Sequence, residues 1–145
     1  MQNRSFDFVS QRDANGIMTV FRKLKKKRIL LVDDDEWIRD SLGYLFEAEG
    51  CLMMTLETAE EGLKVLTHDH YDIIIGDFEL PGINGLEFFK RVQKLQPDSI
   101  KILITAFMNE SLVAEGKKFG IQDFIAKPFN AEVLEDSLAQ LVLEQ

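Results

Sequence analysis

From Arg28 onward, the chain alternates short apolar runs with longer segments in which apolar residues recur at helical spacing. The runs are rich in Ile, Leu and Val, and each carries at most one charge. This composition is typical of strands buried on both faces of a parallel sheet. The predicted strands are Ile29–Val32, Cys51–Leu56, Tyr71–Gly76, Ile100–Thr105 and Asp123–Ala126.

The segments between the runs have the pattern of amphipathic helices. In the first segment, Ile38 and Leu42 are four residues apart and Leu45 follows three residues later. These spacings place the side chains on one face of a helix. Strands that alternate with helices form βαβ units, so the sequence predicts an α/β fold with a doubly wound, five-stranded parallel sheet.

Polar residues and glycines support the same element boundaries. Thr58 is followed three residues later by Glu61, which is the spacing of a capping box at a helix start. Asn130 precedes the last helical segment and is a candidate N-cap. Gly50 and Gly120 lie where helices are expected to end.

Residues 1–27 do not fit this repeat and are treated as a basic N-terminal extension, separate from a domain over residues 28–145. The apolar stretches Phe6–Val9 and Ile17–Phe21 flank Asn15 and Gly16, which is a hairpin signal. A flexible arm is an alternative, as is a natural start at Met18 that leaves a short basic leader. The sequence does not choose among these possibilities.

The bulk composition is that of one globular domain. The chain has 145 residues, of which 46% are hydrophobic and 29% charged. No apolar stretch approaches the roughly 20 residues that cross a bilayer, so we expect a cytoplasmic protein without a membrane segment. Cys51 is the single cysteine, which excludes an internal disulfide.

The net charge of -8 is unevenly distributed. Residues 1–28 hold eight Lys and Arg against two Asp, a balance of +6, whereas residues 29–145 hold nine basic and 23 acidic residues, a balance of -14. An acidic body repels phosphate backbones, so we expect no direct nucleic-acid binding by the domain itself. Proteins or cations are the expected partners.

Polar residues follow the ends of four predicted strands. In a parallel sheet the carboxyl ends of the strands meet at one edge, where ligands bind. Asp33–Asp35 follow the first strand, Asp77 the third and Lys127 the fifth, while Thr105 ends the fourth. We therefore expect these side chains to converge although they are far apart in the sequence.

Such a cluster of carboxylates needs a cation. Two carboxylates about 4 Å apart repel by roughly 4 kcal/mol at an effective dielectric near 20. Mg²⁺ prefers oxygen ligands and keeps several waters, which leaves positions for a phosphoryl oxygen. Asp77 is then the candidate nucleophile, with Lys127 as a charge partner and Thr105 as a hydroxyl donor for the phosphoryl group.

Four motifs together resemble the response-regulator receiver domain of two-component signalling. The resemblance covers about residues 28–145 and implies the flavodoxin-like (βα)5 receiver fold. The motifs are Leu30–Asp35, Asp77 with Leu80–Gly85, Ile104–Ala106 and Ala126–Phe129.

The resemblance implies a role for each matching position. The metal, Mg²⁺ or Mn²⁺, would bind Asp34, Asp77 and the backbone carbonyl of Glu79, with Asp33 acting through water and Asp35 outside the site. Asp77 would be the phosphorylated residue, Thr105 the switch hydroxyl, Lys127 the phosphoryl contact and Phe124 the aromatic that turns inward with Thr105. A cis peptide is implied between Lys127 and Pro128, and the additional carboxylate of Glu79 is expected to alter phosphoryl stability.

The same resemblance implies partners. A histidine kinase or phosphotransfer protein would supply the phosphoryl group, and a downstream protein would read the surface of the fourth helix, fifth strand and fifth helix. That surface is also a candidate homodimer interface. A stand-alone receiver, a shuttle and a piece of a longer regulator all stay open.

Two other functions compete with this interpretation. A haloacid-dehalogenase-like phosphatase also carries an Asp-x-Asp pattern after its first strand, which Asp33 and Asp35 satisfy, but Trp37 stands where that class has Thr or Val. The second alternative is an interaction module whose acidic pocket only binds a metal or a partner. Turnover of small phosphate esters in the absence of any kinase would favour the phosphatase.

Overall fold

The computed structural model describes residues 20–144. Within this range five parallel strands form one sheet in the order β2-β1-β3-β4-β5. The prediction of a doubly wound parallel sheet is therefore confirmed, with the strand order of flavodoxin-like folds. The strands are β1 (Arg28–Val32), β2 (Leu52–Leu56), β3 (Ile73–Asp77), β4 (Ile100–Thr105) and β5 (Asp123–Ala126).

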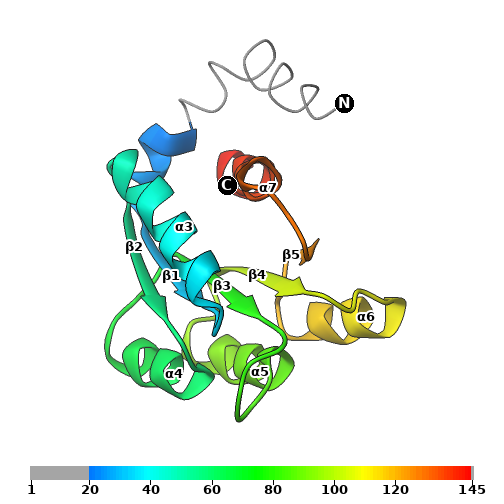
Figure 1. Cartoon of the computed structure of the whole chain (residues 1–145). Helices are drawn as coiled ribbons and strands as arrows, with labels where there is room; N and C mark the ends of the chain where they lie inside the picture. The colour runs from blue at the N-terminus through cyan, green and yellow to red at the C-terminus, as the bar shows by residue number, and fades with distance from the viewer. Residues whose placement is uncertain (1–19, 145) are drawn as a thin grey trace, which may run out of the picture.

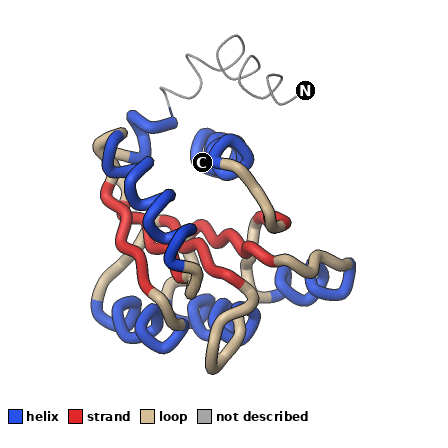
Figure 2. Tube along the Cα trace, in the orientation of Figure 1, coloured by secondary structure: helices blue, strands red, loops and turns tan. Residues whose placement is uncertain are grey.

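A helix follows each strand and crosses back over the sheet. Figures 1 and 2 show α3 and α7 on one face of the sheet and α4, α5 and α6 on the other. The helices are α3 (Glu36–Ala48), α4 (Ala59–His68), α5 (Gly85–Leu95), α6 (Glu110–Lys118) and α7 (Ala131–Leu143). None of the helices in residues 20–144 has both the length and the apolar character needed to span a bilayer.

Two predicted strands begin later than expected. The N–H of Cys51 donates to the carbonyl of Phe46, so this residue closes the end of α3. The N–H of Tyr71 donates to the side-chain oxygen of Gln96 at 2.9 Å and not to a neighbouring strand. At the other end of this strand Asp77 is the last residue of β3.

The predicted caps are confirmed. The Thr58 hydroxyl accepts the N–H of Glu61, and the Glu61 side chain accepts the N–H of Thr58, which completes the capping box of α4. Asn130 caps α7 through the N–H of Val133. Gly50 and Gly120 have φ of 79° and 83° where α3 and α6 end, a conformation that glycine adopts without strain.

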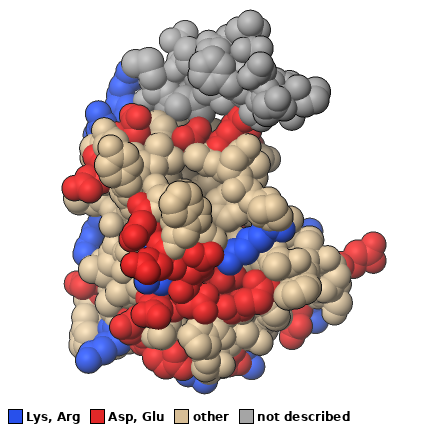
Figure 3. All heavy atoms as spheres, in the orientation of Figure 1, with Lys and Arg blue, Asp and Glu red and all other residues tan. Residues whose placement is uncertain are grey.

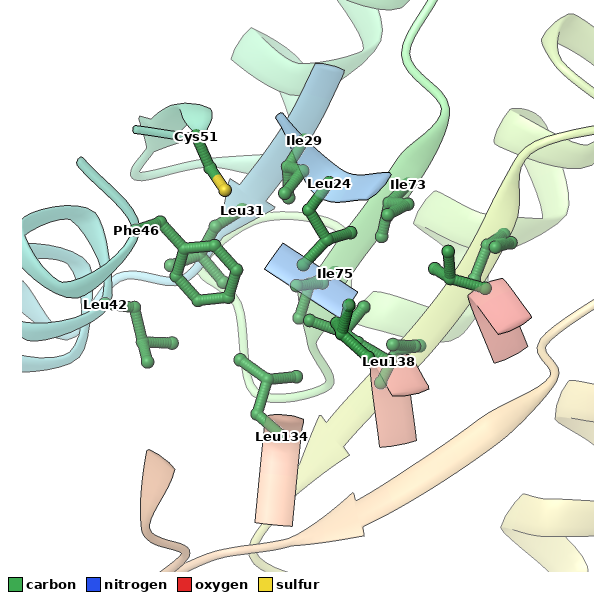
Figure 4. Packing of buried hydrophobic residues seen from close by; sticks show 14 of the residues in the cluster. Leu24, Ile29, Leu31, Leu42, Phe46, Cys51, Ile73, Ile75, Leu134 and Leu138 are labelled. Atoms are coloured by element: carbon green, nitrogen blue, oxygen red, sulfur yellow. The ribbon is translucent and has the colours of Figure 1, made fainter. Parts of the chain in front are cut away.

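The core consists of two apolar layers, one on each face of the sheet. Ile29, Leu31, Ile73 and Ile75 point toward α3 and α7, whose buried residues include Leu42 and Leu138 (Figure 4). The alternate strand residues point toward α4, α5 and α6; they include Leu30, Val32, Ile74 and Leu103. Because both faces are covered, the strands are mostly apolar.

The described part of the N-terminal extension contributes to the first layer. Residues 20–24 are helical, and Val20, Phe21 and Leu24 are buried with the residues of α3 and α7. The ring of Phe21 meets that of Phe46 edge to face, with centroids 5.8 Å apart. Packed residues thus begin before position 28, and Val20 and Phe21 are helical where the hairpin required a strand. The rest of that hairpin lies outside the described residues.

Candidate functional site

The predicted residues converge at the carboxyl edge of the sheet. Asp33 and Asp77 are 0% and 1% exposed, at the ends of the neighbouring strands β1 and β3. Lys127 follows β5, and its Nζ lies 2.9 Å from Asp77 Oδ2 and 3.4 Å from Asp33 Oδ2. The long-range contact that the sequence predicted is therefore present.

A third carboxylate completes an acidic cluster. One carboxylate oxygen from each of Asp33, Asp34 and Asp77 lies within 4.8 Å of the others. Asp34 is exposed, unlike the other two, and can reach a ligand from the solvent side. Figure 3 shows a band of Asp and Glu side chains on this face, over the carboxyl ends of β1 and β3, with Lys or Arg beside it.

Burial and charge set the protonation of these groups. Burial raises the pKa of Asp77 to about 7, although the hydrogen bond from Lys127 opposes the shift. Burial likewise raises the pKa of Asp33, although the hydrogen bond from the N–H of Asp35 and the charge of Lys127 lower it in part. Burial disfavours the charged form of Lys127, but the hydrogen bond with Asp77 and the charges of both carboxylates raise its pKa overall.

The cluster has the chemistry of a hard-cation site. Within residues 20–144 no donor makes a hydrogen bond to the buried Oδ2 of Asp33, which has only Lys127 Nζ at 3.4 Å. The ligand atoms available from Asp33, Asp34 and Asp77 are all oxygens, which Mg²⁺ and Ca²⁺ prefer. A divalent cation would offset the repulsion among the carboxylates.

Asp35 turns away from this cluster. Its carboxylate accepts the N–H of Trp37 at 2.9 Å and that of Ile38 at 3.4 Å, so it is the N-cap of α3. A phosphatase of the Asp-x-Asp kind would need the Asp35 carboxylate beside that of Asp33 in the acidic cluster. The helix cap excludes that arrangement here.

Thr105 ends β4 beside the cluster. Its backbone carbonyl accepts the N–H of Lys127 at 2.8 Å, which ties the ends of β4 and β5 together. The hydroxyl of Thr105 donates to Glu79 Oε2 at 2.8 Å and accepts the N–H of Phe107 at 3.0 Å. The peptide bond between Lys127 and Pro128 is cis, as the resemblance implied.

Sequence reasoning missed the contacts of the Glu79 side chain. Besides the Thr105 hydroxyl, Glu79 accepts the N–H of Ala106 at 3.3 Å. Its own N–H donates to Asp77 Oδ1 at 3.1 Å. The position two residues after Asp77 was the only signal, and it does not reveal the partners of the side chain.

Gly85 is another residue whose role the sequence did not reveal. A Cβ at this position would lie 2.6 Å from the carbonyl oxygen of Asp77 and 2.7 Å from Cα of Phe78. The N–H of Gly85 donates to the carbonyl of Phe78 at 2.9 Å. The start of α5 therefore packs directly on the backbone that carries Asp77.

Phe124 lies on the α6 side of the sheet. It is partly buried in the second apolar layer, and a Cβ at Gly116 of α6 would come within 2.7 Å of its ring. Phe124 therefore packs closely on α6. A link between this ring and Thr105 stays a prediction.

A groove opens beside the acidic cluster. It has a volume of about 610 Å³ and runs between the start of α3 and the segment that joins β5 to α7. Apolar side chains dominate its lining, with Asp35 and Lys127 among the polar ones. Its apolar walls include Trp37, Ile38, Leu42, Pro128 and Phe129.

Comparison with known families gives one match that covers most of the chain. Residues 29–139 match the model described as response regulator receiver domain. Transcriptional regulatory protein GlrR of Escherichia coli (strain K12) is 32% identical over 120 residues, which are 80% of this chain and 27% of that protein. Sporulation initiation phosphotransferase F of Bacillus subtilis (strain 168) is 28% identical over 115 residues, 79% of this chain and 93% of that protein.

The coverage differs strongly between relatives. The chain spans about a quarter of the length of GlrR and of the C4-dicarboxylate transport regulator DctD of Rhizobium meliloti (strain 1021). It spans nearly all of the Bacillus phosphotransferase.

Solved structures agree with these sequence matches. A CheY-like receiver domain protein from Methanospirillum hungatei JF-1 superposes with a TM-score of 0.73 at 31% identity, covering 82% of this chain and 98% of that one. A response regulator protein from Burkholderia pseudomallei with a phosphorylated aspartic acid, calcium ion and citrate has a TM-score of 0.72 at 26% identity, and the match covers 81% of this chain and 71% of that one. The beryllofluoride-activated NtrC4 receiver domain dimer has a TM-score of 0.74 at 30% identity, and the match covers 81% of this chain and 97% of that one.

Proposed function

Because the chain belongs to the response regulator receiver domain family of two-component signalling, we propose that it accepts a phosphoryl group on Asp77. The observation that carries this proposal is the buried carboxylate of Asp77, whose Oδ2 lies 2.9 Å from Lys127 Nζ. Asp33 supplies a second carboxylate beside the same ammonium group, at 3.4 Å. The proposed nucleophile, its cation partner and a proposed metal ligand thus lie side by side at the carboxyl edge of the sheet.

The transfer uses a carboxylate oxygen of Asp77 as the nucleophile. This oxygen attacks phosphorus, the bond from phosphorus to the donor breaks, and the donor leaves with the electron pair. The product is an acyl phosphate on Asp77. Lys127 neutralises charge on the phosphoryl oxygens, and Thr105, which ends β4, donates its hydroxyl to one of them. The chain catalyses only its own phosphorylation and dephosphorylation, and acts on no metabolite.

A divalent cation, Mg²⁺ or Mn²⁺, fits the acidic cluster. Asp34, Asp77 and the backbone carbonyl of Glu79 would bind it directly, and Asp33 would act through water. When bound, the cation offsets the negative charge of the phosphoryl group and of the carboxylates. The calcium ion of the Burkholderia structure is consistent with a hard-cation site in this family.

Signalling requires partners on both sides of the reaction. A histidine kinase or a phosphotransfer protein supplies the phosphoryl group, and the groove between α3 and the β5–α7 segment lies open beside the acidic cluster.

We propose that Thr105 and Phe124 then change the surface of α6, β5 and α7. A downstream protein binds this surface, or two copies of the chain associate through it. The activated NtrC4 dimer is a precedent for association. A cytoplasmic location stays a prediction.

The direct test is phosphorylation by a small donor. Incubation with Mg²⁺ and acetyl phosphate should increase the protein mass by one phosphoryl group, and Asp77→Ala should abolish the increase. Asp40→Ala is the matched control, because Asp40 is an exposed carboxylate of α3 outside the cluster. A wild-type protein that gains no mass under saturating donor, or an Asp77→Ala protein that still gains it, would contradict the proposal. In the first case, an interaction module that only binds metal becomes the better description.

A further inference from the structure

Both oxygens of the Glu79 carboxylate are bound to the end of β4. Oε2 accepts the Thr105 hydroxyl at 2.8 Å, and Oε1 accepts the N–H of Ala106 at 3.3 Å. Thr105 is 0% exposed, so water does not compete for its hydroxyl. Glu79 is itself half-buried, which strengthens hydrogen bonds to a charged acceptor.

These donors are ones that a phosphoryl group on Asp77 would use. A hydroxyl group donates one hydrogen bond at a time, so Thr105 cannot serve both Glu79 and a phosphoryl oxygen. The lone pairs of the hydroxyl do not change this, because a phosphoryl oxygen is itself an acceptor; one of them accepts the N–H of Phe107 at 3.0 Å. In addition, the carboxylate of Glu79 would repel a phosphoryl group nearby.

Lys127 faces no such conflict. Its ammonium group has three donor hydrogens and can contact Asp77, Asp33 and a phosphoryl oxygen together. The hydrogen bonds that must change on phosphorylation are therefore those between Glu79 and the end of β4.

We propose that Glu79 is a latch. In the resting protein its carboxylate accepts hydrogen bonds from the Thr105 hydroxyl and the Ala106 N–H, and phosphorylation requires that these bonds break. This inference rests on the proposed function and makes Glu79 a positioning residue that acts through Thr105. Release also frees the segment after β4, where Phe107 is 68% exposed. Glu79 thus sets how readily the resting arrangement gives way to the phosphorylated one.

Removal of the latch should favour binding of a phosphoryl mimic. Glu79→Ala removes the hydrogen bonds that must break before the mimic can bind. Because a hydrogen bond to a charged group stabilises the resting arrangement, its loss should raise the affinity for beryllium trifluoride, at saturating Mg²⁺, on the order of tenfold. Glu79→Gln keeps one acceptor oxygen and should raise it less. The Ala106 amide resonance of the unliganded protein should shift in Glu79→Ala, whereas the resonances of amides remote from Glu79 should stay in place. Affinity is measured by nuclear magnetic resonance titration.

Two controls separate the latch from simple repulsion. Glu60→Ala removes a carboxylate that lies against Gly82 near the same edge of the sheet, and we expect less than about a twofold change because exposed charges interact weakly. In a Thr105→Val background, Glu79→Ala should lose most of its effect. Repulsion alone predicts the same gain in both backgrounds.

The outcomes distinguish this inference from the proposed function. If the wild-type protein binds beryllium trifluoride but Glu79→Ala binds it no better, or gains equally in the Thr105→Val background, only the latch is wrong. If the wild-type protein fails to bind the mimic with Mg²⁺ present, the phosphorylation site and the latch are both wrong. A thermal unfolding curve for each variant verifies that it is folded.

Discussion

At the scale of single residues, Lys101 is an unusual buried cation. It is the second residue of β4, near the amino-terminal edge of the sheet, and is 1% exposed. Its Nζ donates to the carbonyls of Ser99 at 2.8 Å and Pro97 at 3.3 Å. Burial lowers the pKa of Lys101 to about 8, although the nearby charge of Asp98 opposes the shift.

The lowered pKa of Lys101 predicts a pH-dependent contribution to stability. Between pH 8 and the ordinary value of 10.5, the unfolded chain binds the proton that the folded chain has lost, so the free energy of unfolding rises through this window. Below pH 8 the lysine is charged in both states and the burial penalty is largest. The stability of Lys101→Met relative to wild type should therefore fall by about 1–3 kcal/mol between pH 7 and pH 10.5.

Urea unfolding of both proteins at several pH values measures this difference. Lys90→Met is the matched control, because Lys90 is exposed on α5 and should change stability by no more than about 0.5 kcal/mol. A difference between wild type and Lys101→Met that stays constant from pH 7 to 10.5 contradicts the prediction.

At the scale of elements, Gln96 joins the end of α5 to the last turn of α4 and to the segment between α4 and β3. Its side-chain nitrogen donates to the carbonyls of Leu66 at 2.9 Å and Asp69 at 2.7 Å, and its oxygen accepts the N–H of Tyr71 at 2.9 Å. Gln96→Ala leaves these buried groups without partners and should cost about 2–4 kcal/mol of stability. The midpoint of urea unfolding measures the loss.

Gln93 provides the comparison on the same helix. Among the described residues, no donor satisfies its buried side-chain oxygen. Gln93→Ala therefore removes no hydrogen bond to that atom and should cost less than about 1 kcal/mol. Equal losses in the two variants would show that Gln96 is not the link between these elements.

The helical turn at residues 20–24 belongs to the same scale. Leu24 is fully buried against residues of β1 and α7. Leu24→Ala should therefore cost about 2–5 kcal/mol, as expected for a large-to-small change in a core. The adjacent Lys23→Ala, at an exposed position, should change the unfolding midpoint little. A Leu24→Ala protein as stable as wild type would place this turn outside the folded core.

At the scale of the whole molecule, the acidic cluster couples metal binding to folding. A cation that binds only the folded state stabilises it by about 2.7 kcal/mol at 100 times its dissociation constant. Mg²⁺ should raise the melting temperature of the wild-type protein, and Asp33→Asn should largely remove this rise. Without Mg²⁺, Asp33→Asn should be at least as stable as wild type, because burial penalises the charged form of Asp33.

Differential scanning calorimetry with and without Mg²⁺ measures both effects. Asp98→Asn serves as the control, since Asp98 is exposed on the segment before β4, at the opposite edge of the sheet. A Mg²⁺-induced rise of the same size in wild type and Asp33→Asn would mean that the cation binds elsewhere.

The sequence alone determined the alternation of strands and helices and the set of residues at the carboxyl edge. Each of these follows from a local pattern. Buried strands such as Ile73–Asp77 are apolar up to their last residue, and parallel strands have their carboxyl ends at one edge of the sheet. Asp33, Asp77 and Lys127 meet for this reason, although 50 residues separate the last two.

Only the tertiary structure gave the physical reason why Asp35 stays outside the site, as the resemblance had implied. Asp33, Asp34 and Asp35 are identical residues in a row. In the structure Asp35 is the N-cap of α3, and Asp33 is buried beside Lys127. Glu79 and Thr105 are 26 residues apart, and the packing of Val20, Phe21 and Leu24 joins the extension to α3 and α7. Such contacts depend on side-chain directions and distances between separate elements, which no local pattern specifies.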